Sequence, residues 1–422
     1  MRSALFKLGI LLCAFASVAW AAAPQFSTQA RVGLTTGDQW EPAVAADGSG
    51  HIYVLYPHYG KVPECKDCLI PTMLRTVSND NGKTWQPPQL MFEADSGQFD
   101  AQIAVDPADR RTVYAAWLQN GKRAVMLAKS TDFGMTWTYT LAVRSEVQLD
   151  KPALAVRGQN VYVAFNHEEQ VWVAVSQDSG RSFLPARVNE GRPGWSLLGA
   201  ATVDPTGDVY LAWASYSKVG GARGAVGLYF AKSIDLGKSW DTSLVDVSAA
   251  APGCKEEECG EGYLGAQVAL TSDTDGTLYA LWSAGNAALG AQRIYFSSST
   301  NSGETWIPKI SVSYAEAGVE HAFPAIVAGA GGDVRIAWMD KRRSPYWNTY
   351  YRSSSNGGAT WGEEIRVSGY VPGYRYIDKK GFRFPFGDYF SMAIDNHNDT
   401  HIVWGEGLNY QSPGSIWHAA GR

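Results

Sequence analysis

The chain has 422 residues, with 36 lysines and arginines against 41 aspartates and glutamates, and a formal net charge of −5. Hydrophobic residues make up 45% of it, which excludes wholesale disorder, and the acidic balance argues against a nucleic-acid partner because phosphate binding needs clustered Lys and Arg. The 44 glycines, 16 tryptophans and 21 tyrosines favour many short strands joined by tight turns over a helical bundle.

Residues 1–21 have the pattern of a cleavable signal peptide. Arg2 and Lys7 precede an apolar run over residues 8–18, and Ala19 and Ala21 are small residues at the two positions that a signal peptidase reads. The apolar run is shorter than the ~20 residues of a membrane anchor. We therefore expect a secreted or periplasmic protein without a membrane anchor.

Seven β-hairpins are predicted along the rest of the chain. Each has an alternating strand, a turn and a second strand that ends in two apolar residues and an aromatic one, as in residues 42–56 (PAVAADGSGHIYVLY). The seven aromatic residues are Tyr56, Trp117, Phe165, Trp213, Trp282, Trp338 and Trp404. This regularity indicates repeated small sheets.

An eight-residue motif, Ser-x-Asp-x-Gly-x-x-Trp, occurs six times between these hairpins. Its copies begin at Ser78, Ser130, Ser176, Ser233, Ser299 and Ser354, with Phe183 in place of Trp in the third copy and Asn301 and Asn356 in place of Asp in the last two. Gly supplies a positive φ, and Asp or Asn can bond the turn backbone. The motif therefore predicts a turn between third and fourth strands, with the Trp packed between neighbouring sheets, and we assign it a structural role.

The two ends of the chain reconcile seven hairpins with six turns. One more strand is expected at residues 415–420, with no fourth strand after it, while residues 30–32 (ARV) repeat the fourth-strand sequence of residues 186–188. The sequence thus predicts an all-β, seven-bladed β-propeller of four-stranded blades, closed by the N-terminal strand, as a single domain over residues 22–422. Six blades plus an accessory hairpin is the alternative.

The eight-residue turn resembles the Asp-box, or bacterial neuraminidase repeat (BNR repeat), of the sialidase-like superfamily. This resemblance covers nearly the whole mature chain and implies a β-propeller, although Asp-boxes also occur in propellers that are not sialidases. Sialidases resemble one another in a Tyr nucleophile paired with a Glu, an Asp acid/base and three arginines that bind the substrate carboxylate. The first arginine lies in an Arg-Ile-Pro motif, where this chain has Trp40-Glu41-Pro42, so one bidentate contact is missing.

The resemblance also implies candidate catalytic residues. Tyr389, in GDYFSMAID (residues 387–395), matches the position of the nucleophile, and Glu320 is its candidate partner. Arg342 and Arg343 are candidates for one substrate-binding arginine, with a structural ion pair between Asp340 and Arg342 as the alternative. Asp100 and Asp150 are candidates for the acid/base by position.

Propeller geometry predicts the face that carries the site. The first strands begin and the second strands end on one face, which also carries the long loops, whereas the Asp-boxes lie on the opposite face. We call the first face the funnel face. The residues predicted there to bind a ligand are Trp40, Glu41, Tyr59, Asp100, Asp150, His321, Asp340 and Asp388.

Four cysteines remain after the signal peptide, as the pairs Cys65/Cys68 and Cys254/Cys259. In an oxidising compartment they predict two local disulfides. We expect no cofactor and no metal site. His397 and His401 have the spacing of a zinc pair, but that spacing binds zinc on a helix and here spans a predicted turn.

These patterns predict a monomeric, exported propeller that recognises a glycan or an extracytoplasmic protein at the funnel face, without full sialidase chemistry. The alternative is an exo-sialidase-like glycoside hydrolase, or a lyase, that uses Tyr389, Glu320 and an Asp of the funnel. A third possibility is a scaffold whose outer blade edges bind partners.

Overall fold

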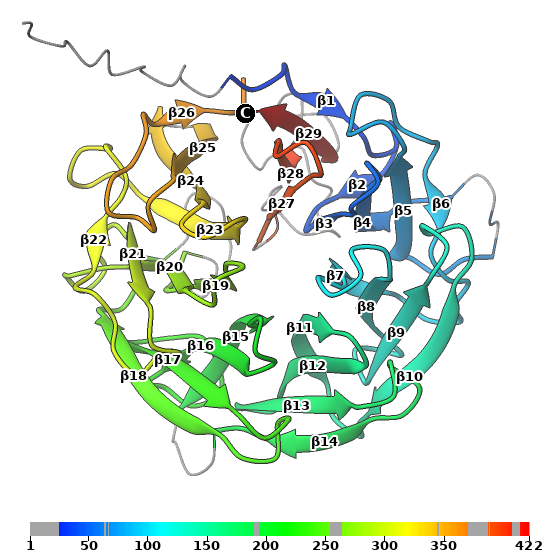
Figure 1. The fold of residues 1–422 in the computed structure, drawn as a ribbon, viewed down its shortest axis with the longest axis horizontal. Helices are drawn as coiled ribbons and strands as arrows, with labels where there is room; N and C mark the ends of the chain where they lie inside the picture. The colour runs from blue at the N-terminus through cyan, green and yellow to red at the C-terminus, as the bar shows by residue number, and fades with distance from the viewer. Residues whose placement is uncertain are drawn as a thin grey trace, which may run out of the picture.

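The computed structural model describes residues 25–62, 65, 67–189, 194–253, 264–343, 346–369, 387, 389–406 and 414–421. These residues form seven antiparallel sheets arranged as blades around a central axis, which confirms the seven-bladed β-propeller (Figure 1). None of the described segments forms a helix with the length and apolar character needed to cross a membrane. The predicted signal peptide, Asp388, Cys254 and Cys259 lie outside the described residues.

The first four blades follow one another in chain order. Blade 1 has β2 (Asp38–Gln39), β3 (Ala43–Ala46), β4 (Ile52–Tyr59), β5 (Thr72–Ser78) and β6 (Gln89–Leu90), and its β2 and β3 both pair with β4. Blade 2 has β7 (Phe99–Val105), β8 (Val113–Gln119), β9 (Ala124–Ser130) and β10 (Thr138–Arg144). Blade 3 has β11 (Leu149–Arg157), β12 (Asn160–His167), β13 (Gln170–Ser176) and β14 (Leu184–Arg187). Blade 4 has β15 (Trp195–Val203), β16 (Val209–Tyr216), β17 (Val226–Ser233) and β18 (Asp241–Ser248).

The remaining three blades complete the ring. Blade 5 has β19 (Val268–Ser272), β20 (Leu278–Ala284), β21 (Arg293–Ser299) and β22 (Ile310–Ser311). Blade 6 has β23 (His321–Ala328), β24 (Val334–Arg343), β25 (Tyr346–Ser354) and β26 (Ile365–Arg366). Blade 7 combines β27 (Ser391–Ile394), β28 (Thr400–Glu406) and β29 (Ser415–Gly421) with β1 (Ala30–Arg31) from the start of the described chain.

The N-terminal strand closes the ring, as the repeat count predicted. Strand β1 pairs antiparallel with β29, with Ala30 opposite His418 and Arg31 opposite Trp417. Just before β1, Phe26 forms a bridge with Gly421 and packs edge-on against the ring of Tyr351 at 4.9 Å.

Each Asp-box is a turn built on its own side chains. In blade 2, the Ser130 hydroxyl donates to Asp132 at 2.8 Å and accepts the Gly134 amide at 2.9 Å, while Asp132 accepts the Thr136 amide at 2.9 Å. Gly134 has a φ of 76°, which a residue with a Cβ rarely adopts. Asn301 replaces the Asp in blade 5 and still accepts the Thr305 amide at 3.0 Å, so the turn tolerates Asn as predicted.

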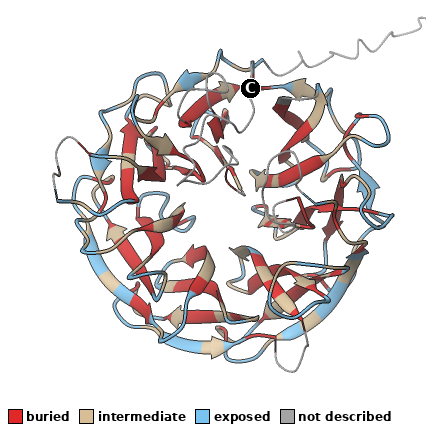
Figure 2. Ribbon diagram, turned by 180° about the vertical axis from the view of Figure 1, so that it is seen from behind, coloured by how far each residue is buried: buried red, intermediate tan, exposed pale blue. Residues whose placement is uncertain are grey.

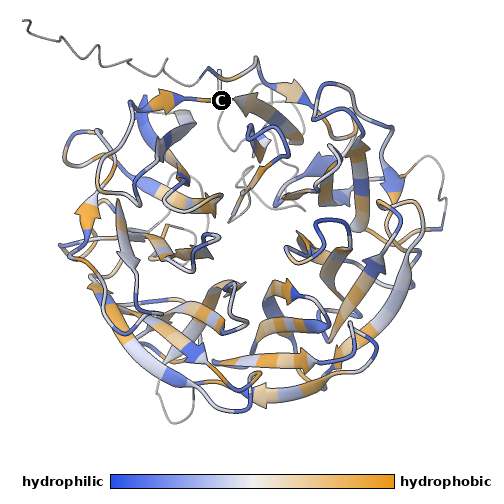
Figure 3. Cartoon of the chain, in the orientation of Figure 1, coloured by the Kyte–Doolittle hydropathy of each residue, from blue (hydrophilic) through white to orange (hydrophobic). Residues whose placement is uncertain are grey.

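The aromatic residue that ends each Asp-box packs on the preceding blade. Trp306 lies edge-on to Phe230 at 5.2 Å, and Trp85 of blade 1 lies edge-on to His418 of blade 7 at 5.0 Å. The hydrophobic core therefore lies between adjacent blades, where the second strands are almost entirely buried (Figure 2). The strands carry most of the apolar side chains, and the connecting turns are largely hydrophilic (Figure 3).

Candidate functional site

A cavity of about 440 Å³ lies on the propeller axis and is lined by the first strands of all seven blades. Most lining side chains are small or apolar. Among the described lining residues, the charged ones are Asp100 and Lys151, on neighbouring blades, and Tyr389 of blade 7 lines the same cavity. The charged lining residues thus lie on one side of the cavity. We call this side, together with the residues around it, the blade 1–3 mouth, and define it by Glu41, Tyr59, Asp100, Lys122, Asp150, Lys151 and Tyr389.

The backbone at this mouth is strained at equivalent positions of three successive blades. Glu41, Asp100 and Lys151 have φ values of 54°, 56° and 48°, and the strand register shifts beside Asp100 and beside Lys151. A residue with a Cβ held in this conformation costs of order 1–3 kcal/mol, and such strain is found preferentially at active sites and ligand-binding sites. Phe323 of blade 6 has the same conformation, with a φ of 55° beside a register shift, so the bulge recurs among the blades and here orients the side chains of Glu41, Asp100 and Lys151 at the rim.

Lys122, on the hairpin between β8 and β9, joins blades 2 and 3. Its Nζ lies 3.4 Å from Asp100 Oδ2 and 3.2 Å from Asp150 Oδ1. Burial opposes its charge, but the carboxylates of Asp100, Asp150 and Glu41 outweigh this and raise the pKa of Lys122. The ammonium group is therefore held charged between carboxylates. Lys122 was not predicted as a site residue because it belongs to no motif, and its place on a hairpin of the funnel face was the one available signal.

Trp40 and Tyr59 form a stacked aromatic pair on blade 1, with ring centroids 4.1 Å apart and an interplanar angle of 21°. Trp40 is only 2% exposed, whereas Tyr59 is half-buried. Burial, together with the negative charges of Glu41 and Asp100, raises the pKa of Tyr59, so its phenol is neutral and its hydroxyl can donate to a ligand. Trp40 therefore supports Tyr59 from beneath.

Tyr389 extends from blade 7 to the side of blades 2 and 3. Its hydroxyl donates to the Ala101 carbonyl at 3.4 Å, and the Lys151 ammonium lies 5.2 Å from its ring centroid. A Cβ on Gly387 would lie 2.2 Å from Glu41 Cγ, so the backbone before Tyr389 passes very close to blade 1. The structure thus places the candidate nucleophile against Ala101 and Lys151, the residues that directly follow the two candidate acid/base aspartates in the chain. Its pairing with Glu320 stays a prediction, and Asp388 lies outside the described residues.

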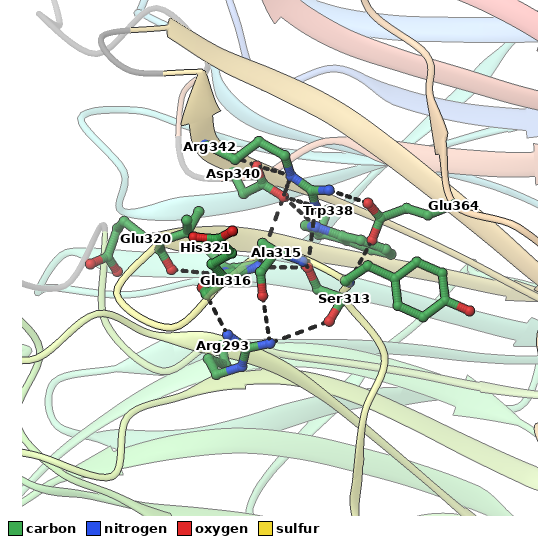
Figure 4. Close-up of polar contacts among 12 residues, drawn as sticks. Arg293, Ser313, Ala315, Glu316, Glu320, His321, Trp338, Asp340, Arg342 and Glu364 are labelled. Carbon is green, nitrogen blue, oxygen red and sulfur yellow. Dashed lines mark hydrogen bonds and ion pairs between the residues drawn. The ribbon is translucent and has the colours of Figure 1, made fainter.

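Asp340 and Arg342 form the ion pair predicted as the structural alternative. Arg342 Nε lies 2.8 Å from Asp340 Oδ1, and its Nη1 pairs with Glu364 (Figure 4). The guanidinium also lies 3.8 Å from the ring centroid of Tyr350. Although burial opposes the charge, hydrogen bonds to Asp340 and Glu364 raise the pKa of Arg342. The guanidinium of Arg342 is therefore already bound by Asp340, Glu364 and Tyr350.

His321 and Asp340 are both fully buried. His321 Nε2 lies 2.8 Å from Ser313 Oγ and its Nδ1 lies 2.9 Å from the Gln292 carbonyl, and burial lowers the pKa of the imidazole. Glu320 Oε1 accepts the Gln292 amide at 3.1 Å. Arg343 is exposed. We therefore assign His321 and Asp340 to the packing of blade 6 against blade 5.

The polar residue at the end of several second strands has a shared structural role. A buried indole Nε1 donates to the side chain two residues later, which satisfies an N–H that would otherwise be unpaired. The pairs are Trp117–Gln119 at 3.1 Å, Trp338–Asp340 at 3.0 Å and Trp404–Glu406 at 2.5 Å. The carboxyl groups at these positions thus have a structural role, which is to accept the hydrogen bond of a buried tryptophan.

A disulfide and an acidic cluster lie apart from the residues that line the cavity. Cys65 and Cys68 are joined by a disulfide in the loop after β4. Asp395, His397 and Asp399 bring possible ligand atoms within 4.8 Å of one another, but Asp395 Oδ1 accepts the backbone amides of both other residues at 2.9 and 2.8 Å. The closeness of these residues is explained by a turn in which the Asp395 side chain binds backbone amides, and we assign no metal to it.

The BNR repeat-like domain family matches residues 12–253, more than half of the chain, and the chain belongs to this family. No curated protein sequence matches it. A protein of unknown function from Dyadobacter fermentans has a similar structure, with 14% identity, a TM-score of 0.55 and coverage of 95% of this chain and 100% of that one.

Two carbohydrate-active enzymes share the fold. An ulvan lyase has 12% identity and a TM-score of 0.54, over 92% of this chain and 95% of its own. The NanB sialidase of Streptococcus pneumoniae has 11% identity and a TM-score of 0.51, over 80% of this chain and 69% of its own. At these identities the likeness shows the sialidase-like propeller fold and nothing about activity.

Proposed function

We propose that the protein is an exported, monomeric propeller that recognises a glycan at the blade 1–3 mouth. The observation that carries this proposal is that Asp100, Lys151 and Tyr389 line one side of a cavity whose other described lining residues are uncharged. Asp150 joins this side through Lys122, which also contacts Asp100, and Tyr59 stacks on Trp40 beside Glu41. Sugars are bound by a few placed carboxylates and amines that exchange hydrogen bonds with hydroxyl groups, next to an aromatic ring. The fold shared with a lyase and a sialidase is consistent with this ligand class.

The second candidate function is a glycoside hydrolase or lyase that uses Tyr389. The observation in its favour is the Lys151 ammonium 5.2 Å from the Tyr389 ring, because a nearby cation favours the phenolate form of a tyrosine. Against it, the carboxyl oxygens of Asp100 and Asp150 already contact the Lys122 ammonium at 3.4 and 3.2 Å, whereas a general acid must direct its carboxyl group at the leaving group of the substrate. Arg342 is already engaged by Asp340 and Glu364. Binding without full sialidase chemistry is the better-supported reading.

The scaffold hypothesis has less support. Leu184 and Val247 on the outer strands are 78% and 63% exposed, but these edges carry features that block strand addition. Strand β14 contains Pro185, and the registers of β10 and β18 shift at residues 141–143 and 244–246. Bulges and proline are common devices against edge-to-edge pairing.

A glycan array combined with a panel of 4-methylumbelliferyl glycosides tests the proposal. The wild type is compared with Tyr389→Phe, with Lys151→Met at the mouth, and with the matched control Lys238→Met on the Asp-box turn of blade 4. We expect glycan binding that Lys151→Met weakens at least tenfold and Lys238→Met leaves unchanged, with no turnover. Failure to bind any glycan would overturn the proposal, and turnover abolished by Tyr389→Phe would establish the enzyme instead.

A further inference from the structure

The number and placement of the charged groups at the blade 1–3 mouth indicate which ligands it can bind. Glu41 lies just before β3, and Asp100 and Asp150 are the second residues of β7 and β11 on the next two blades. Lys122 and Lys151 are the cations of the mouth. Carboxylates therefore outnumber ammonium groups. Glu41 also stands next to the position at which the sialidase-like motif has an arginine, and none of the described residues that line the cavity is an arginine.

Both lysines already have partners. Lys122 lies between Asp100 and Asp150, with its Nζ 3.4 and 3.2 Å from their carboxylate oxygens, and Lys151 lies over the ring of Tyr389. An acidic group that approached Lys122 would meet these two carboxylates at nearly the same distance. The attraction of one ammonium for a new anion would thus be opposed by two like charges, which is the arrangement that excludes a wrong partner.

The same carboxylates suit a different ligand. Asp150 uses Oδ1 to accept from Lys122, and its side chain is 37% exposed, so the carboxylate can also accept a hydroxyl or ammonium hydrogen from outside. Tyr59 adds a neutral phenol on blade 1. These groups match a sugar that offers hydroxyl or amine donors. At Lys122 an incoming carboxylate or sulfate would meet two negative groups beside the positive one, which leaves Lys151, over the ring of Tyr389, as the other cation of the mouth.

We infer that the blade 1–3 mouth accepts uncharged or amine-bearing sugars and rejects acidic ones. This inference rests on the proposed glycan recognition and specifies its ligand class. It also separates this chain from propellers whose arginines bind a sugar carboxylate. The discrimination is electrostatic, so it falls as salt screens the mouth.

The experiment is a binding measurement on an array that carries neutral, amine-bearing and acidic glycans of matched length, at about 0.05 M and 0.5 M NaCl. We expect the strongest ligands to be neutral or amine-bearing and the acidic glycans to bind at least tenfold more weakly at low salt. Higher salt should narrow that gap. Acidic glycans that bind as tightly as the neutral ones, or more tightly, would overturn the inference while leaving glycan recognition intact.

Asp150→Asn tests the assigned charge directly. The amide keeps the size and one acceptor oxygen but removes a negative charge, so acidic glycans should gain affinity relative to neutral ones by several-fold. Asp241→Asn, on the exposed outer strand β18, is the matched control and should change neither. A relative affinity that Asp150→Asn leaves unchanged would refute the role of this carboxylate, and the thermal midpoint confirms that both variants fold. If no glycan of any charge binds, the proposed function fails and this inference fails with it.

Discussion

Glu406 provides a quantitative test of how the blades are held together. The residue ends β28, is 1% exposed, and accepts hydrogen bonds from Trp404 Nε1 at 2.5 Å and Gln29 Nε2 at 3.2 Å. Burial raises the pKa of its carboxyl from 4.5 to about 8, and the two hydrogen bonds only partly oppose this. The folded protein therefore keeps this proton at neutral pH, whereas the unfolded chain releases it.

The sign of the pH dependence follows from proton binding. Below pH 4.5 the carboxyl is protonated in both states, so its contribution to stability is constant. Between pH 4.5 and about 8 the folded protein binds more protons than the unfolded chain, so its stability falls as the pH rises. At about 1.36 kcal/mol per pH unit, the loss across this window is at most roughly 5 kcal/mol.

Glu406→Gln removes the titration. Glutamine can accept the indole hydrogen bond, as Gln119 does for Trp117 in blade 2 at 3.1 Å, but its amide group faces the Gln29 donor. We expect the variant to be slightly less stable than the wild type at pH 5 and more stable at pH 8.5.

Thermal unfolding at pH 5, 7 and 8.5 measures this effect as the difference in midpoint between variant and wild type. Other groups titrate in both proteins and cancel in that difference. Glu316→Gln, at an exposed glutamate, is the matched control and should shift the midpoint equally at every pH. A Glu406→Gln difference that does not change sign or size with pH would refute the assignment of a protonated carboxyl.

Three further predictions concern the repeats. Burial lowers the pKa of His418 to about 3, so the wild type loses stability as the pH falls from 6.5 towards 3, and His418→Phe should lose less in acid unfolding curves. Asp132→Ala should cost about 1–2 kcal/mol in denaturant unfolding because three hydrogen bonds of the turn are lost, while Asp132→Asn should cost less, and equal costs would contradict the turn geometry. Trp306→Ala should lower the free energy of unfolding by about 3 kcal/mol because it removes the contact with Phe230. An unchanged midpoint of denaturant unfolding would show that this contact between blades 4 and 5 does not stabilise the protein.

The fold was predictable because its information is local. Each Asp-box needs a Gly with positive φ and an Asp or Asn within a few residues, and six copies of that chemistry fix the turns wherever they occur. Ring closure by residues 30–32 could also be read from the sequence, because those residues repeat an outer strand and the last blade lacks one.

The site was less predictable because its contacts are long-range. Asp100 and Asp150 were placed at the funnel face by the order of strands, but their shared partner Lys122 comes from a hairpin with no motif. The contact of Tyr389 with Ala101 joins residues 288 positions apart, which no local pattern encodes. The burial of Asp340 could not be predicted either, because no sequence pattern indicates that this side chain is fully buried.

A structure of the protein with the tightest neutral or amine-bearing glycan from the array would show where the ligand binds. We predict a sugar within hydrogen-bonding distance of Asp150 and Lys151, next to Tyr59 and Tyr389, at the funnel end of the 440 Å³ cavity. A sugar bound instead on the Asp-box face or along the outer strands would contradict it.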